Sequence, residues 1–329
     1  MRILIVLIVI VAASWSAYWF VGARALDRAI RAGIEDARDS GIEVETDRLK
    51  VTGFPNRFDT IIDAPRLGFP QSGIAWSAPF LRLFALSYRP NRIIAVLPDT
   101  QRIEGPFGTL RIETDTARAA ATFKPGPSLT LDHANLVAEG LAVAGAGQKV
   151  TMARLLAATR LPEGETDGTV QNIGVTLDGI DLPGVLAARL GGAGAARIDS
   201  ATLDATLRLS EPLDRRALQG APIRVREIRV ETLEIAWGEV SLAASGDLEV
   251  DGAGIPTGEI EAVLTNWPRA LEIASGAGLL PPEQVATARQ AMSMLAAMSG
   301  GSGKLTVPLT FRDGRIYLGP VPLGPAPRL

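Results

Sequence analysis

Four short stretches of the chain contain residue types that could bind a ligand or do chemistry. GGSGKL (residues 300–305) places glycines before a lysine, as loops that bind phosphate do. EGETDG (residues 163–168) spaces three carboxylates two apart, like the start of a calcium loop. His133 is the only histidine, and GFPNRFD (residues 53–59) joins two apolar runs. The neighbouring residues decide which of these chemistries is feasible.

The phosphate-loop and calcium-loop patterns are both incomplete. A phosphate loop needs a glycine five positions before Gly303 and a serine or threonine after the lysine, but Met298 and Leu305 stand there. A calcium loop needs a bidentate glutamate at its twelfth position, which here is Gly174. We therefore interpret the first stretch as the lead into a strand and the second as a solvated acidic turn.

The residues that most catalytic and metal sites require are scarce. The chain has no cysteine, which excludes thiolate metal sites, thiol catalysis and disulfides. With one histidine, His-pair metal sites are impossible, and the alternating segment LTLDHANL around His133 contains no nucleophile elbow. Carboxylate pairs that meet only in the fold stay open, although nothing local marks one. We predict no catalytic residues, no metal ligands, no cofactor and no enzymatic activity.

The charge of the chain bears on its partners. Binding to nucleic acid needs a basic surface that neutralises phosphates. The formal net charge is −3 and the sequence shows no basic stripe, so we predict that nucleic acid is not a partner.

The N-terminal segment is apolar enough to cross a membrane. No charged residue stands between Arg2 and Arg24, and at about 1.5 Å per residue the run from Ile3 to Val21 covers the roughly 30 Å of a hydrocarbon core. We predict a transmembrane anchor over residues 1–23. Its Trp and Tyr residues lie near the C-terminal end, where amphipathic rings favour the headgroup layer. The predicted anchor residues are Ile3, Leu7, Val11, Trp15, Tyr18, Trp19 and Phe20.

A cleaved signal peptide is the alternative to an anchor, because Val21-Gly22-Ala23 supplies the small residues that a signal peptidase recognises. The apolar run is longer than a usual signal core and aromatic residues crowd the site, so we favour the uncleaved anchor. Orientation is open at this stage. Three arginines between residues 24 and 31 favour a cytoplasmic body by charge counting, but large C-terminal domains are exported largely regardless of such counts.

GFPNRFD is best explained as a structural turn. Proline removes a backbone donor and glycine permits unusual dihedral angles, so the stretch ends the strand containing Leu49 and Val51 and leads into the strand containing Ile61. We expect its arginine to pair with its aspartate across the turn rather than to face a lipid headgroup. The predicted turn residues are Gly53, Phe54, Pro55, Asn56, Arg57 and Asp59.

The rest of the chain is predicted to be mainly β. A short stalk helix over residues 24–41, with apolar residues at helical spacing and Gly41 as its C-cap, continues from the anchor. From residue 42 the apolar period becomes two, which is typical of strands. We predict a single elongated β domain over residues 42–329, formed by a long, curled, mostly antiparallel β-sheet with a groove-like form.

Two local features interrupt this period. In IRVREIRVETLEIAWG (residues 223–238) the apolar residues change parity twice, so we predict two bulges or short turns. Residues 282–299 are predicted to form the one helix near the C-terminus, since proline precedes a run of helix formers and Gly300-Gly301 follows it. Its apolar side, which we assign to the core, consists of Val285, Met292, Leu295 and Met298.

Several stretches together resemble a known bacterial family. The anchor, GFPNRFD, WSAPFLRLFALSYRPNRIIAVLP (residues 76–98) and LTVPLTFRDGRIYLGPVP (residues 305–322) are similar to the family catalogued as domain of unknown function 2125 (DUF2125). That family implies no established activity. By architecture, the chain also remotely resembles the AsmA-like envelope proteins, whose anchor leads into a curled sheet with an apolar trough implicated in phospholipid traffic. This resemblance implies a single-pass inner-membrane protein with its body in the periplasm.

Two functions are compatible with these observations. In the first, the apolar face of the sheet is an open groove that binds or shields lipid acyl chains, with phospholipid as the expected ligand, in envelope lipid transport or homeostasis. In the second, that face is a closed core, and the protein is a non-enzymatic envelope scaffold or assembly factor that recruits protein partners through sheet edges or the later helix. Period-two alternation does not separate an open face from a filled one.

Overall fold

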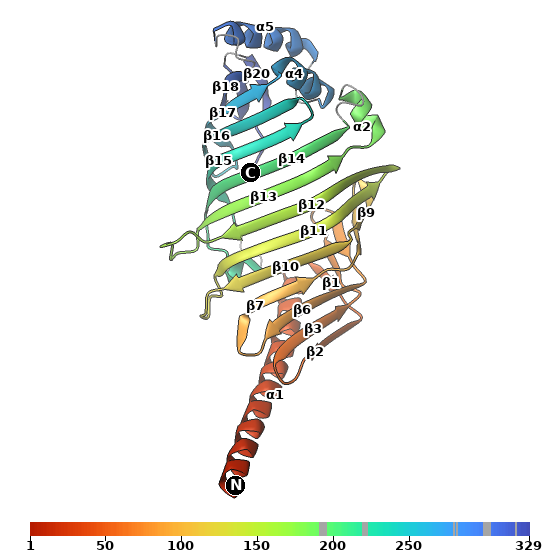
Figure 1. The fold of residues 1–329 in the computed structure, drawn as a ribbon, viewed down its shortest axis with the longest axis vertical. Helices are drawn as coiled ribbons and strands as arrows, with labels where there is room; N and C mark the ends of the chain where they lie inside the picture. Colours follow the sequence, from red (N-terminus) through yellow and green to blue (C-terminus); the bar gives the residue numbers. More distant parts are fainter. Residues whose placement is uncertain (191–195, 219–222, 279, 281, 299–303, 320) are drawn as a thin grey trace. The chain divides into compact units, whose positions relative to one another are not determined.

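The computed structural model describes residues 1–190, 196–218, 223–278, 280, 282–298, 304–319 and 321–329 (Figure 1). Strands account for 52% of the chain, so the predicted mainly β fold class is confirmed. By their contacts the residues form two compact units. Unit 1 comprises Met1–Ala138, Val143–Ala146 and Asp214–Ala221, and unit 2 comprises Glu139–Ala142, Gly147–Leu213 and Pro222–Leu329. The predicted single domain over residues 42–329 stays a prediction.

One continuous helix, α1 (Arg2–Asp39), contains both the predicted anchor and the predicted stalk (Figure 1). Its end is a reversal built on Gly41, which adopts a φ of 85°. The Gly41 N–H donates to the Arg38 carbonyl at 2.9 Å, and the Ile42 N–H donates to the Ala37 carbonyl at 3.0 Å. These two bonds close the last carbonyls of the helix, as in a Schellman motif, and confirm Gly41 as the C-cap glycine.

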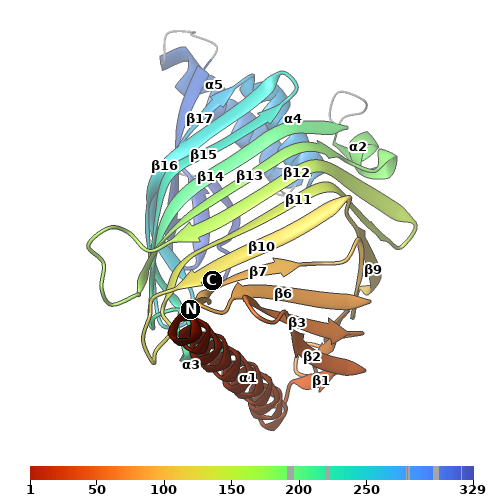
Figure 2. The same cartoon turned by 60° about the horizontal axis from the view of Figure 1, so that its bottom comes forward.

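Unit 1 contains two antiparallel ladders. One has the strand order β2–β3–β6–β7–β10, and the other has the order β1–β4–β5–β8–β9. Figure 2 shows α1 beside β1 and β2. The strands are β1 (Glu43–Glu45), β2 (Arg48–Thr52), β3 (Arg57–Asp63), β4 (Arg66–Phe69), β5 (Ile74–Ser77), β6 (Phe80–Leu86), β7 (Arg89–Val96), β8 (Thr100–Gly105), β9 (Gly108–Glu113) and β10 (Thr116–Phe123), with helix α3 (Arg215–Leu218). Strand β11 (Leu131–Gly145) is divided between the units.

Unit 2 is an antiparallel meander in which each strand from β12 to β20 pairs with the next along the chain. Short turns join several neighbouring strands, such as β15 and β16, whereas α2 lies between β13 and β14, and α4 and α5 lie between β17 and β18. The strands are β12 (Gln148–Arg160), β13 (Val170–Asp181), β14 (Arg197–Leu209), β15 (Val225–Trp237), β16 (Val240–Val250), β17 (Pro256–Thr265), β18 (Lys304–Arg312), β19 (Arg315–Leu318) and β20 (Val321–Pro325). The helices are α2 (Gly184–Arg189), α4 (Trp267–Gly276) and α5 (Pro282–Met298).

Strand β15 contains the two irregularities that its sequence predicts. In the pairing with β14, consecutive residues of β14 face Thr232 and then Val230, so one residue of β15 is skipped. The same happens between Glu227 and Val225. Glu231 and Arg226 are therefore the extra residues, and each resets which side of the strand the next apolar residue occupies. The prediction of two bulges is confirmed.

The helices of unit 2 were only partly predictable. Helix α5 confirms the predicted helix at residues 282–299, while Gly300 and Gly301 and the side chain of Met298 lie outside the described residues. Helices α2 and α4 of unit 2, and α3 of unit 1, were not predicted from the sequence. Helix α4 spans only ten residues, which is too few for a clear helical period. A local signal was nevertheless present, since Asn266 precedes α4 and Pro268 lies in its first turn.

Candidate functional site

Unit 2 contains an apolar cavity of about 370 Å³. Its walls come from strands β15 to β20 and from helices α4 and α5, and all of its lining residues are aliphatic, Met or Trp. The lining residues are Ile235, Trp237, Val240, Leu242, Ala262, Leu264, Ala270, Leu271, Ile273, Ala274, Leu280, Ala288, Met292, Val307, Leu309, Leu318 and Leu323.

Strand alternation turns these residues toward the same side of the sheet. Along β16, Val240 and Ala244 are buried and Leu242 is half-buried, whereas the intervening Ser241 and Ala243 are exposed. The register extends this side across the meander, because Ile235, Leu242, Leu264 and Leu305 pair in one row from β15 to β18. The period of two in the sequence therefore indicates the wall of the cavity.

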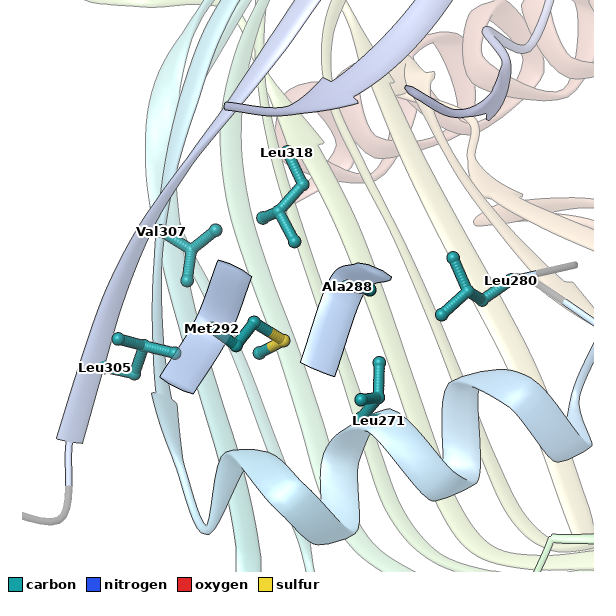
Figure 3. Close-up of a cluster of buried hydrophobic side chains, with 7 residues drawn as sticks. All are labelled: Leu271, Leu280, Ala288, Met292, Leu305, Val307 and Leu318. Carbon is teal, nitrogen blue, oxygen red and sulfur yellow. The ribbon is translucent and has the colours of Figure 1, made fainter. Parts of the chain in front are cut away.

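Helices α4 and α5 supply the opposite wall. Leu271 of α4 is 5% exposed, and Ala288 and Met292 of α5 are 0% and 4% exposed. Figure 3 shows these side chains turned toward those of Val307 and Leu318 on the sheet. Val285 and Leu295 of α5 pack against the same cluster, which agrees with the predicted apolar side of this helix.

The chemistry of this cavity is that of a hydrocarbon site. Among the described residues, its lining carries no carboxylate, ammonium, guanidinium or hydroxyl group, so a charged or strongly polar ligand would lose its hydration without compensation from these side chains. Its volume falls within the range of about 300–1,000 Å³ that is usual for small-molecule pockets. An apolar cavity of this kind can accept an apolar ligand instead of water.

The GFPNRFD stretch is the turn between β2 and β3 in unit 1, where the sequence places it. Gly53 has a φ of 103°, and a Cβ there would lie 2.8 Å from the Arg57 carbonyl oxygen, so the position requires glycine. The Phe54–Pro55 peptide bond is cis. Arg57 Nη2 lies 2.7 Å from Asp59 Oδ2, which forms the expected ion pair at the start of β3. The Arg57 N–H closes the turn on the Gly53 carbonyl at 2.9 Å.

Aromatic side chains of α1 satisfy carbonyl groups of this turn and of the β6–β7 connection. Trp15 Nε1 donates to the Pro55 carbonyl at 3.0 Å, and Trp19 Nε1 donates to the Arg57 carbonyl at 2.8 Å. The Tyr18 hydroxyl donates to the Ser87 carbonyl at 2.7 Å. Two of these acceptors, Pro55 and Ser87, lie in the connections between strands, and the third, Arg57, is the first residue of β3.

These contacts form a small core, which we call the junction cluster: Trp19, Ala23 and Phe58, at 5%, 8% and 6% exposure. Phe54 packs edge-on against Trp19, with ring centroids 5.4 Å apart, and stacks on Phe20 at 5.6 Å. From the sequence we expected the Trp and Tyr residues to lie in the headgroup layer. Their contacts with the β2–β3 turn and the β6–β7 connection were not predicted. The available signal was the i, i+4 spacing of Trp15, Trp19 and Ala23 on one helix face.

The remaining anchor residues lie outside the folded body. Ile3, Leu7 and Val11 are 86%, 56% and 60% exposed, as expected of side chains that face lipid. Helix α1 is long and apolar enough to cross a membrane. The aromatic end of the anchor packs against the β2–β3 turn, whereas the side chains of its N-terminal half are exposed.

The other candidate motifs are placed as follows. His133 is exposed near the start of β11, and its Nδ1 lies 2.9 Å from Asp132 Oδ2. In the EGETDG turn the Asp167 N–H donates to Glu165 Oε1 at 2.9 Å, and no helix flanks it. Of GGSGKL, only Lys304 and Leu305 are described, and both belong to β18. In the part of the chain that the structure describes, no three His, Asp or Glu residues converge as a metal site would need.

Comparison with known proteins gives one family. A family model described as "Uncharacterized protein conserved in bacteria (DUF2125)" matches residues 19–327. No curated protein matches the chain. The matched region begins at Trp19, so it includes the junction cluster and most of both units, but not the first 18 residues of the chain, which include the start of α1.

Proposed function

Because this chain belongs to DUF2125, a family described only as uncharacterised, we propose its function from geometry: the protein binds a lipid acyl chain in the cavity of unit 2. The observation that carries the proposal is a cavity of about 370 Å³ whose described lining side chains are all apolar. Each methylene transferred from water into such a site contributes about 0.8 kcal/mol. An acyl chain gains this contribution at each buried methylene, which is why we propose it as the ligand.

The volume of the cavity limits how much of a lipid it can hold. An apolar cavity of about 150 Å³ accepts benzene, which corresponds to about 25 Å³ per carbon atom. On that scale, the cavity of about 370 Å³ takes about fifteen carbon atoms. This is one acyl chain rather than the two chains of a diacyl phospholipid, so the second chain and the headgroup would stay outside.

The proposal includes a cellular setting. We propose a single-pass inner-membrane protein with its body in the periplasm, acting in envelope lipid transport or homeostasis. The exposed apolar half of α1 supports the membrane anchor, and the remote resemblance to AsmA-like proteins motivates the periplasmic side. Labelling of single cysteines introduced into unit 2 with a membrane-impermeant maleimide in intact spheroplasts would test that side.

Photolabelling of the purified full chain tests the cavity directly. A palmitic acid analogue with a diazirine near its methyl end should label peptides of α4, α5 and β16 to β18. Ala274→Phe places a ring in the cavity and should reduce this labelling at least tenfold. Ala286→Phe adds the same ring to an exposed position of α5 and should leave labelling unchanged.

Labelling confined to α1 would contradict acyl-chain binding in unit 2. Equal labelling of the Ala274→Phe and Ala286→Phe variants would do the same. In either case the scaffold hypothesis, in which the sheet and α5 recruit a protein partner around a closed core, would be the better account.

A further inference from the structure

A second concave surface lies in unit 1, at the C-terminal end of the apolar segment of α1. This groove, of about 690 Å³, runs between α1 and residues 49–54 of β2 and the following turn. Two adjacent ridges of α1 form its floor, one with Trp19, Ala23 and Asp27 and the other with Phe20, Arg24 and Arg28. The groove is therefore apolar at one end and charged at the other.

The charged end is cationic. Arg24 and Arg28 are exposed, and within the described residues neither forms an ion pair; Arg28 Nε donates only to the Arg24 carbonyl at 3.3 Å. Asp27, the one carboxylate in the lining, is held by Arg31 through two bonds of 2.9 and 3.2 Å. That hydrogen bond and the charge of Asp27 raise the pKa of Arg31 above its ordinary value. The charge of Asp27 is thus neutralised, and two free guanidinium groups remain.

The position of the groove along α1 defines its surroundings. At about 1.5 Å per residue, the apolar run from Ile3 to Val21 occupies about 28 Å, which is nearly the whole hydrocarbon core. Arg24 then lies about 4.5 Å beyond the run and Arg28 about 10 Å beyond it. The headgroup layer adds about 5–7.5 Å on each side of the core, so Arg24 lies within it and Arg28 lies at its outer edge. Phe20 lies at the boundary between the headgroup layer and the acyl chains.

We propose that this groove binds the headgroup of an anionic phospholipid from the leaflet that surrounds the C-terminal end of the membrane segment. Arg24 and Arg28 would bind the phosphate, because guanidinium groups match its oxygens in bidentate geometry. Phe20 and the 51% exposed ring of Phe54 would contact the glycerol and the start of the acyl chains. The inference requires the anchor but does not require an acyl chain in the cavity of unit 2.

Native mass spectrometry of the delipidated full chain in mild detergent tests the proposal. Added phosphatidylglycerol should be retained more strongly than phosphatidylcholine with the same acyl chains. The double variant Arg24→Gln/Arg28→Gln should weaken phosphatidylglycerol binding by about 25-fold, as expected for the loss of two cations near a membrane surface. The matched control Arg92→Gln/Arg118→Gln removes two other exposed arginines of unit 1 and should retain wild-type binding.

Three results would overturn the proposal. One is equal binding of phosphatidylglycerol by the wild-type chain and the Arg24→Gln/Arg28→Gln variant. Another is equal retention of phosphatidylcholine and phosphatidylglycerol by the wild-type chain. The third is displacement of phosphatidylglycerol by an equal concentration of inorganic phosphate, which would identify a free anion rather than a lipid as the ligand. Circular dichroism of each variant checks that its fold is intact.

Discussion

The junction cluster of unit 1 and the cavity of unit 2 are both apolar, but they are built from different contacts. At the junction, aromatic side chains of α1 donate hydrogen bonds to carbonyls of the body, so each donor has a fixed position and its neighbours close around the rings. In unit 2 the walls are aliphatic side chains and methionine with a single Trp, and a cavity of about 370 Å³ is left between them.

The difference follows from the directionality of the contacts. An indole or phenol that donates a hydrogen bond specifies both its own orientation and the backbone group that it meets. Dispersion contacts between aliphatic groups specify neither, and a methionine side chain adapts its shape to what lies beside it. Directional hydrogen bonds suit a rigid attachment, whereas adaptable aliphatic contacts suit a site that binds and releases a ligand.

Removal of the Trp19 ring from the junction cluster should lower the free energy of unfolding more than any other substitution discussed below. We expect Trp19→Ala to lower the free energy of unfolding of unit 1 by about 3–5 kcal/mol, because the ring leaves a cavity around Phe58 and its hydrogen bond is lost. Trp19→Phe should cost less, since a ring remains. Amide hydrogen exchange in β2 and β3 measures the loss. Unchanged protection in Trp19→Ala would show that the junction is not a core.

Adding atoms should cost more stability at the junction than in the cavity. A Cβ at Gly22 would lie 2.8 Å from Cζ of the buried Phe58 ring, so Gly22→Ala should destabilise the protein by about 1–3 kcal/mol despite the better helix propensity of alanine. Ala274→Phe adds a whole ring to the cavity wall and should cost less than about 1 kcal/mol, because space is already present. Thermal unfolding of the two variants in one detergent provides the comparison. A larger loss in Ala274→Phe would show that the cavity is not available.

The ion pair of the turn should contribute least. The Arg57 side chain is 55% exposed, so solvent screens its attraction to Asp59. We expect Arg57→Gln to cost at most about 1 kcal/mol, and we expect the cost to shrink in high salt. Urea unfolding at two salt concentrations measures both effects. A loss above about 2 kcal/mol, independent of salt, would mean that Arg57 acts through packing instead.

Local patterns in the sequence predicted the local features well. The C-cap glycine at Gly41, the turn at GFPNRFD and the two bulges of β15 depend on residues that are neighbours in the chain. The reason is that backbone conformation and strand parity are set by the residues concerned and those next to them. The paired Arg57 and Asp59 belong to this class, being two residues apart.

The candidate sites were not predictable in the same way, because they combine distant residues. Nothing in the sequence states that Trp15 meets Pro55, or that Tyr18 meets Ser87. Similarly, alternation in β16 and β17 indicates which side chains share a face, but the packing of α4 and α5 decides whether that face is covered tightly or over a cavity. Helix α4, which forms part of the cover, was itself missed.

The burial of Trp19 and Ala23 bears on how the chain is processed. The small residues at positions 21–23 offer a protease a place to cut, but a cut there would remove Trp19 and leave Phe58 facing water. We therefore predict that the apolar segment is retained rather than cleaved, since its last turns contribute side chains to the folded body. On this prediction, release of the body from the membrane would require unfolding around Phe58.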